Sequence, residues 1–535
     1  MIFQLVKANA DFPNLVYVLL FQRGTIEKAL SGMGGVDGPQ FLDKVVQVGF
    51  DIPKLSPEKL EKALDSGIRA VVENTPAERK FDAQRWPQLF ISAIRPYFQT
   101  LRDTKRFSNS LSFHFELYRN DDTFDANPID LIALEILRQF EPLLYQKLHS
   151  ARELLTGRSG LSFDLPQGHK KEVEALLEKT NRPDCARSIV EELFPPAATA
   201  LAESEVTIRS TFTDEWLRGL RVCHPDVFER YFRFSLAEED LSETDFASLL
   251  TAVAYRDRFV AKLKELNQKR LLSAAVGRLR VDLPLISVDN AVPFITGLFD
   301  IEKELVPLTS GRGVTSVPLE QRAIAIVHAL LRQVPLDKRG AILKESVAQT
   351  TALYLPMMSF EWSKEQREQK SDPLVSDQDA EHLQELCLNK VRAATQAQDL
   401  LSHPQLRYIL RVWLRWGSIE AAPSWVKAKA AASDLNLLAL LKPFTEQMNQ
   451  MEENHLVRTL FKFAIEDFAR YVEPQEIADR VRQLASSSPD REDKIRCQLF
   501  LRAFKDWNLG DKSDELASAG PPDLGKWTTI EDLKI

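Results

Sequence analysis

Two short apolar runs near the beginning of the chain have the pattern of buried strands. The first, LVYVLLF at residues 15–21, is rich in β-branched and aromatic side chains and is followed by Gly24. The second covers residues 45–50. A helix-like segment from Thr25 and a glycine-rich loop, SGMGGVDG from Ser31, lie between them. This order of strand, helix, loop and strand is typical of a parallel α/β sheet.

After Pro53 the apolar residues recur at spacings of three and four, which predicts helices. Ser56 is the expected N-cap of the first of these, with Pro57 at its first position. Segments such as RAIAIVHALLRQV from Arg322 and LVRTLFKFAIEDFARYV from Leu456 have the same helical spacing. Most of the chain is therefore predicted to be helical.

The clearest helix signal begins at Asn127, which we expect to cap a helix that has Pro128 in its first turn. Asp130 follows in the same turn, where a negative charge is favoured. Pro142 is predicted to end or kink this helix. One apolar face is formed by Ile129, Ile132, Ile136 and Phe140.

Breaks in these patterns predict several domains, as expected for 535 residues. Glycines and prolines between residues 157 and 209 indicate a connector, and the charged stretch 363–379 indicates a solvated loop or an exposed helix. The predicted division is 1–157 as an α/β domain, 158–210 as connector, 211–362 as a helical region, 363–380 as a charged loop or linker, and 381–535 as a C-terminal helical region.

Composition and charge narrow the class of protein without assigning a function. The net charge of −8 provides no strong overall basic field for nucleic acid or anionic lipid, although a local basic patch stays open. The four cysteines lie far apart and form no C-x-x-C pair, which argues against a zinc site and fits a reducing compartment. No signal peptide or membrane-spanning run is evident, so we expect a cytoplasmic location.

Several separate sequence blocks follow one another along the chain: FQLVKANADFPNLVYVLLFQRGTIEKAL from Phe3, FLDKVVQVGFDIP from Phe41, RDTKRFSNSL from Arg102, NPIDLIALEILRQFEPLLY from Asn127 and HPDVFERYFRFSL from His224. In this order they resemble the KAP family of P-loop NTPases, with weaker likeness from Asp289 and Ser402. This resemblance implies that residues 1–157 are a partial P-loop NTPase domain with a helical lid, the C-terminal remnant of a parallel-sheet core, followed by a large helical region. It also implies ATP and Mg²⁺ as cofactors.

The resemblance lacks its phosphate-binding part, because in the family the P-loop and the acidic Mg²⁺-positioning strand precede the block that begins at Phe3. A search for G-x-x-x-x-G-K-[ST] finds no match. The nearest segment, GPPDLGKWT at residues 520–528, has Trp527 where the metal-binding hydroxyl belongs, and we interpret it as a C-terminal loop. We therefore expect an N-terminally truncated NTPase that does not hydrolyse ATP alone. A late start codon in the gene model, a split gene and a degenerate copy would each account for the missing P-loop.

Gln22 follows the first predicted strand, where the resemblance implies a polar residue, usually Asp, near the γ-phosphate. A glutamine side chain can orient an attacking water by hydrogen bonding but brings no negative charge. A catalytic sensing role is one interpretation of Gln22. A loop residue that caps the strand is the other.

Arg102, Lys105 and Arg106 lie within one and a half helical turns, and Asn109 follows one turn later. The resemblance implies that these residues contact nucleotide phosphates, with Arg106 as the best single candidate. An ordinary solvated helix face is the alternative. No metal ligands are predicted in this chain.

Three further features are predicted to be structural. Asp130, Glu135 and Glu141 are expected to cap helices or face solvent rather than form a catalytic carboxylate set. The adjacent Cys223 and His224 are expected to point in different directions, which argues against a nucleophile and base. The SGMGGVDG loop has no lysine and is interpreted as a flexible loop rather than a phosphate cradle.

Two functions follow as hypotheses. The first is a KAP-type, ATP-driven switch, in a setting such as phage defence or signalling, completed by a missing N-terminal NTPase half or by a second copy. The second is a non-enzymatic helical scaffold that binds protein partners. Involvement of nucleic acid stays open in both.

Overall fold

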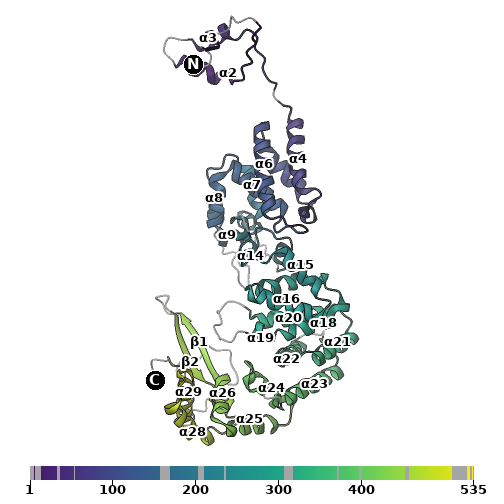
Figure 1. The fold of residues 1–535 in the computed structure, drawn as a ribbon, viewed down its shortest axis with the longest axis vertical. Helices are drawn as coiled ribbons and strands as arrows, with labels where there is room; N and C mark the ends of the chain where they lie inside the picture. Colours follow the sequence, from purple (N-terminus) through teal and green to yellow (C-terminus); the bar gives the residue numbers. More distant parts are fainter. Residues whose placement is uncertain are drawn as a thin grey trace. The chain divides into compact units, whose positions relative to one another are not determined.

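A computed structural model describes residues 5–6, 14–32, 37–53, 55–156, 169–202, 210–233, 236–306, 317–369, 373–396, 400–451, 457–508, 527–529 and 533 (Figure 1). By its internal contacts the chain divides into a first unit, Met1–Ala63, and a second unit, Leu64–Ile535. The domain boundaries predicted from the sequence stay predictions, and each unit is described by itself.

The first unit is built from short helices. Helix α2 (Arg23–Ser31) packs against α3 (Gly38–Val45), and the Asp37 side chain caps α3 by accepting a hydrogen bond from the Gln40 N–H. Helix α4 (Pro57–Val72) begins at the predicted proline and continues into the second unit.

The prediction of two buried strands in this unit is wrong. Residues 15–21 form no strand, and Val16, Val18 and Leu20 are between 81 and 87% exposed. In the second run, Val45 ends α3 while Phe50 is exposed. A strand needs a neighbour to complete its hydrogen-bond ladder and an apolar layer to cover its face, and the described residues of this unit supply neither. Part of the glycine-rich loop, residues 33–36, lies outside the described residues.

The second unit is mainly helical, as predicted, and its first half confirms the Asn127 helix. The Asn127 side chain accepts hydrogen bonds from the backbone of Ile129 and Asp130, and Pro142 begins the next helix. The helices of this half are α5 (Trp86–Leu89), α6 (Leu101–Leu117), α7 (Pro128–Phe140), α8 (Pro142–Ser150), α9 (Arg152–Thr156), α10 (Lys170–Leu177), α11 (Pro183–Leu193), α12 (Pro195–Leu201), α13 (Ser210–Arg218) and α14 (Pro225–Phe228), with short 3₁₀ turns such as η1 (Pro76–Lys80).

The second half of this unit shares one apolar core that extends from Leu241 to Phe504, and the predicted Arg322 helix is confirmed as part of α20. Its helices are α15 (Glu243–Ala252), α16 (Arg256–Gln268), α17 (Leu272–Val281), α18 (Ala291–Asp300), α19 (Glu302–Leu305), α20 (Leu319–Arg332), α21 (Leu336–Gln349), α22 (Tyr354–Gln369), α23 (Asp377–Gln396), α24 (Leu406–Trp416), α25 (Ala421–Ala432), α26 (Asp434–Leu441), α27 (Ile465–Phe468), α28 (Pro474–Ser487) and α29 (Arg491–Asn508).

The helix predicted from Leu456 is wrong over its first half. Strand β2 (Val457–Phe463) pairs antiparallel with β1 (Thr445–Met451), with Thr445 opposite Phe463, and contacts α29 (Figure 1). The same residues satisfy a helical spacing and a strand pattern, and tertiary packing decides between them. The Phe463 ring packs 5.3 Å from that of Phe500 on α29, a contact that holds the strand against the core.

Candidate functional site

Helix α6 carries four of the five predicted site residues on one face. The Thr100 hydroxyl accepts from the Asp103 N–H at 3.2 Å, while the Asp103 carboxylate accepts from the Thr100 N–H at 2.9 Å, which fixes the start of the helix. The buried side chains of α6 include Phe107 and Leu111. Positions three, four and seven residues apart then share the exposed side, which we call the basic face of α6: Arg102, Lys105, Arg106 and Asn109.

The three cations of this basic face form no ion pair within the described part of the chain. The exposed ring of Phe113, one turn beyond Asn109, extends the same side of the helix. Unpaired guanidinium groups on a helix are able to hold a phosphate by paired hydrogen bonds. They are also stable when they are simply hydrated on an exposed helix face. Nucleotide contact by these residues therefore stays a prediction.

Gln22, the fifth predicted site residue, lies in the first unit at the N-cap of α2. Its side chain is exposed, and its Oε1 accepts a hydrogen bond from the Thr25 hydroxyl at 3.0 Å. The backbone of Gln22 is extended. The predicted role in orienting water stays a prediction. The segment of residues 520–526 with partial P-loop likeness lies outside the described residues.

Buried polar side chains join the inner side of α6 to α7. Glu135 accepts both a pair of 2.8 Å hydrogen bonds from Arg138 and a contact from His114 Nδ1 at 3.2 Å. Burial alone would raise the pKa of Glu135, but His114 and Arg138 outweigh it and hold that pKa below its ordinary value. Arg138 also donates to the Ser110 hydroxyl, so this cluster fixes how α6 sits on α7.

Of the expectation that Asp130, Glu135 and Glu141 cap helices or face solvent, the second part is wrong, because all three are buried and accept hydrogen bonds. Asp130 is completely buried and accepts from Arg85 at 2.9 Å and from the Val222 N–H at 2.9 Å. Glu141 accepts from the Tyr97 hydroxyl at 3.0 Å and from backbone N–H groups beyond α8. Sequence reasoning missed these roles because the partners are distant in sequence; Val222 is 92 residues from Asp130.

The N-terminus of α7 is also joined to the turn that follows α13. The Asn127 amide donates to the Gly219 carbonyl at 3.0 Å, and its backbone N–H donates to the Tyr231 hydroxyl at 2.7 Å. Tyr231 in turn donates to the Leu220 carbonyl at 2.6 Å. Leu220 has a φ of 50°, a left-handed conformation that this bonding holds in place.

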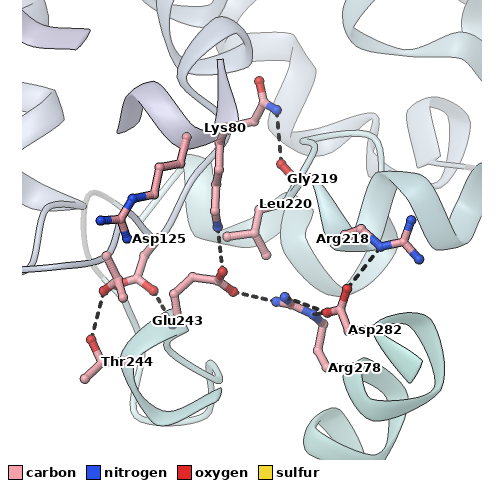
Figure 2. Close-up of polar contacts among 12 residues, drawn as sticks. Lys80, Asp125, Arg218, Gly219, Leu220, Glu243, Thr244, Arg278 and Asp282 are labelled. Atoms are coloured by element: carbon pink, nitrogen blue, oxygen red, sulfur yellow. Dashed lines mark hydrogen bonds and ion pairs between the residues drawn. The ribbon is translucent and has the colours of Figure 1, made fainter. Parts of the chain in front are cut away.

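A chain of ion pairs of alternating sign continues from η1 into α17 (Figure 2). Lys80 pairs with Glu243 at 2.7 Å, and Glu243 pairs with Arg278 at 2.5 Å. Arg278 also pairs with Asp282 at 3.0 Å, and Asp282 accepts from Arg218 at 3.0 Å. We call these five residues the ion-pair chain.

Burial governs the electrostatics of the ion-pair chain. Burial alone would raise the pKa of Glu243, but Lys80 and Arg278 outweigh it and lower that pKa. Burial lowers the pKa of Lys80 more strongly than Glu243 raises it. It also raises the pKa of Asp125, whose carboxylate accepts from the Glu243 N–H at 2.6 Å. Each interior member therefore depends on both neighbours for its charge balance.

The structural interpretation of Cys223 and His224 is confirmed. Burial raises the pKa of the Cys223 thiol to about 12, so it is not a thiolate nucleophile at neutral pH. The His224 ring instead caps α14, with Nδ1 accepting from the Asp226 N–H at 3.2 Å.

The region that contains the basic face of α6 matches a known protein family. Residues 1–118 match the KAP family P-loop domain. The match ends just beyond α6 and confirms the resemblance over these residues. No curated protein and no solved structure gives a significant match to the chain.

The part of the chain that the structure describes contains no cluster of three or more His, Cys, Asp or Glu side chains arranged to hold a metal ion. None of its helices is both long and apolar enough to cross a membrane.

Proposed function

We propose that this protein works as a nucleotide-dependent switch of the KAP type, in which the basic face of α6 contacts nucleotide phosphates. The observation that carries the proposal is the position of Arg102, Lys105 and Arg106. They lie together on one exposed helix face without carboxylate partners in the described structure, inside the segment that matches the family. Arg106 is the principal phosphate contact in this proposal.

The cofactor fit differs between ATP and Mg²⁺. Arginine and lysine side chains on α6 suit the phosphates of ATP. The described residues supply no cluster of ligands for Mg²⁺, so no step of the proposal depends on the ion. Phosphate binding on α6 would instead act on α7 through Glu135, His114 and Arg138.

From α7 the polar contacts of Asn127 and Asp130 lead to the turns around α13 and α14. A shift of α7 would therefore displace these turns and, through them, the helices that carry the ion-pair chain. This connection supports an output in the helical half, where a change of packing alters a partner-binding surface. Phage defence and signalling are both compatible settings.

Calorimetric titration of the full chain with ATP, with and without Mg²⁺, tests the proposal. Replacing Arg106→Ala is expected to weaken binding about tenfold, the value of one charge-assisted hydrogen bond. Arg187→Ala is the matched control, because Arg187 is an exposed helical arginine whose one ion pair among the described residues is with Glu191. Equal affinity in both variants would remove α6 from the nucleotide site, and absence of binding in the unaltered chain would favour a scaffold.

The exposed apolar side chains of the first unit favour a second candidate function, assembly with another polypeptide. Val16, Val18 and Leu20 face solvent over residues that match a P-loop domain, whose strands normally lie in a covered sheet. The partner would be an NTPase half that contains a P-loop, or a second copy of this chain. Sedimentation of the unaltered chain and of Val18→Asp tests self-association: a concentration-dependent dimer that the aspartate weakens supports it, and a monomer at all concentrations excludes it.

A further inference from the structure

A cleft in the second half of the second unit combines arginines with aromatic walls. It has a volume of about 560 Å³, within the range of pockets that hold small organic ligands. Helices α20, α22 and α24 and the residue after the α27 turn contribute to it. The side chains that matter to its chemistry are Glu361, Trp362, Tyr408, Arg411, Arg415 and Arg470.

The carboxylate in this cleft is already engaged. Glu361 is buried and pairs with Arg415 through one oxygen, while the other accepts from the Trp416 indole N–H at 2.8 Å. It therefore compensates the charge of Arg415 alone. Of the three arginines that line the cleft, Arg411 and Arg470 are left for a ligand.

Arg411 has no carboxylate partner in the described structure and lies over the Tyr408 ring, 5.1 Å from its centroid. Arg470 Nε lies 3.5 Å from one oxygen of Asp467, while Arg407 pairs with the other oxygen at 2.6 Å, so this carboxylate is shared between two arginines. A chain with a net charge of −8 thus keeps two weakly compensated guanidinium groups at one cleft.

The charges of Arg411 and Arg470 act on the same region. Arg411 on α24 and Arg470 beyond α27 both line the cleft, so two guanidinium groups from separate elements reach the same space. Such a pair suits the oxygens of a phosphate better than a single charge does.

The aromatic part of the cleft suits a ring. Trp362 is half-buried and packs on the core beside the His328 ring, whose centroid is 6.1 Å from its own. Its indole remains part of the cleft wall. An indole and a guanidinium plane are both surfaces on which an aromatic base stacks.

We propose that this cleft binds an aromatic organic phosphate of the nucleoside phosphate class, with Arg411 and Arg470 on the phosphate and Trp362 against the base. The site is separate from α6 and needs no metal ion. Through this cleft, the second half of the second unit would respond to a ligand independently of α6.

The test is calorimetric titration of the full chain with AMP in excess EDTA, with adenosine and inorganic pyrophosphate as separate probes. AMP is expected to bind at least tenfold more tightly than either probe, since only AMP offers both a base and a phosphate. Arg411→Ala is expected to weaken AMP binding at least tenfold. Arg482→Ala is the matched control, because Arg482 is an exposed helical arginine outside the cleft.

A second variant separates stacking from phosphate contact. Trp362→Phe keeps a ring and is expected to weaken AMP severalfold while leaving pyrophosphate binding unchanged. Far-ultraviolet circular dichroism checks that each variant is folded. AMP affinity unaltered by Arg411→Ala, or AMP binding no tighter than adenosine, overturns the proposal. Binding that requires Mg²⁺ and is lost in Arg106→Ala would also overturn it, and would support the α6 site instead.

Discussion

Two apolar segments of this molecule have opposite environments. Residues 15–21 form a continuous apolar run that stays largely exposed, whereas helix α7, which also carries charged residues, is buried along nearly its whole length. The difference lies in what surrounds them, since α7 has α6, α8 and α11 against it. An apolar run therefore indicates that a segment is stabilised by burial, but it does not show that the same chain supplies the residues that bury it.

The largest expected effect is the loss of stability when a buried carboxylate, rather than an exposed one, is removed. Asp130→Ala is expected to cost about 3 kcal/mol of unfolding free energy, because buried Arg85 keeps only Glu192 of its two carboxylate partners and the buried Val222 N–H loses its acceptor. Asp43→Ala, which removes an exposed pair with Arg23, is expected to cost far less, because water screens this pair. Urea unfolding measures both, and equal costs would contradict the contrast.

Matched isoleucines test the apolar side of the contrast. Ile132 on α7 is completely buried, and Ile132→Ala is expected to cost about 3 kcal/mol through lost burial and a cavity. Ile52 in the first unit is 81% exposed, and Ile52→Ala is expected to change stability by less than about 0.5 kcal/mol. A large loss at Ile52 in the isolated chain would mean that the first unit is covered after all.

The core of the second unit also predicts a pH dependence. Burial lowers the pKa of His328 to about 4, so the folded chain holds this ring neutral while the unfolded chain protonates it below about pH 6.5. Its contribution to stability is present above pH 6.5 and is lost as the pH falls toward 4, by about 2 kcal/mol between pH 7 and 4.5. In His328→Gln this part of the pH dependence of urea unfolding should disappear, and an unaltered profile would rule His328 out.

The smallest expected effect is on the basic face of α6. Arg106→Ala should change the unfolding free energy by less than about 0.5 kcal/mol, because the side chain is exposed and unpaired in the described structure. Arg138→Ala on α7 should cost more, since it removes two hydrogen bonds from buried Glu135. Thermal or urea unfolding that ranks Arg106 above Arg138 would show that α6 is packed differently.

The sequence predicted what depends on local signals. The α7 helix could be located from Asn127, Pro128 and Pro142, because capping and proline geometry act within a few residues. The shared face of Arg102, Lys105, Arg106 and Asn109 likewise follows from helical spacing alone.

What depends on distant partners could not be predicted. Asp130 looked like an ordinary first-turn carboxylate, and only folding brings Arg85 and Val222 to it. β2 is a strand because β1 pairs with it, although its spacing also fits a helix. The Arg411 cleft draws on elements separated by more than a hundred residues, and no local motif marks it.

The ion-pair chain has a consequence for how this sequence can change over generations. Because Lys80, Glu243, Arg278 and Asp282 alternate in sign, replacing one interior member removes one partner from the charge on each side of it. Tolerated substitutions at these positions would have to occur together with compensating substitutions at their partners. Sequence change at these positions should therefore be slow and correlated. Homologues would then differ at Glu243 and Arg278 together or at neither.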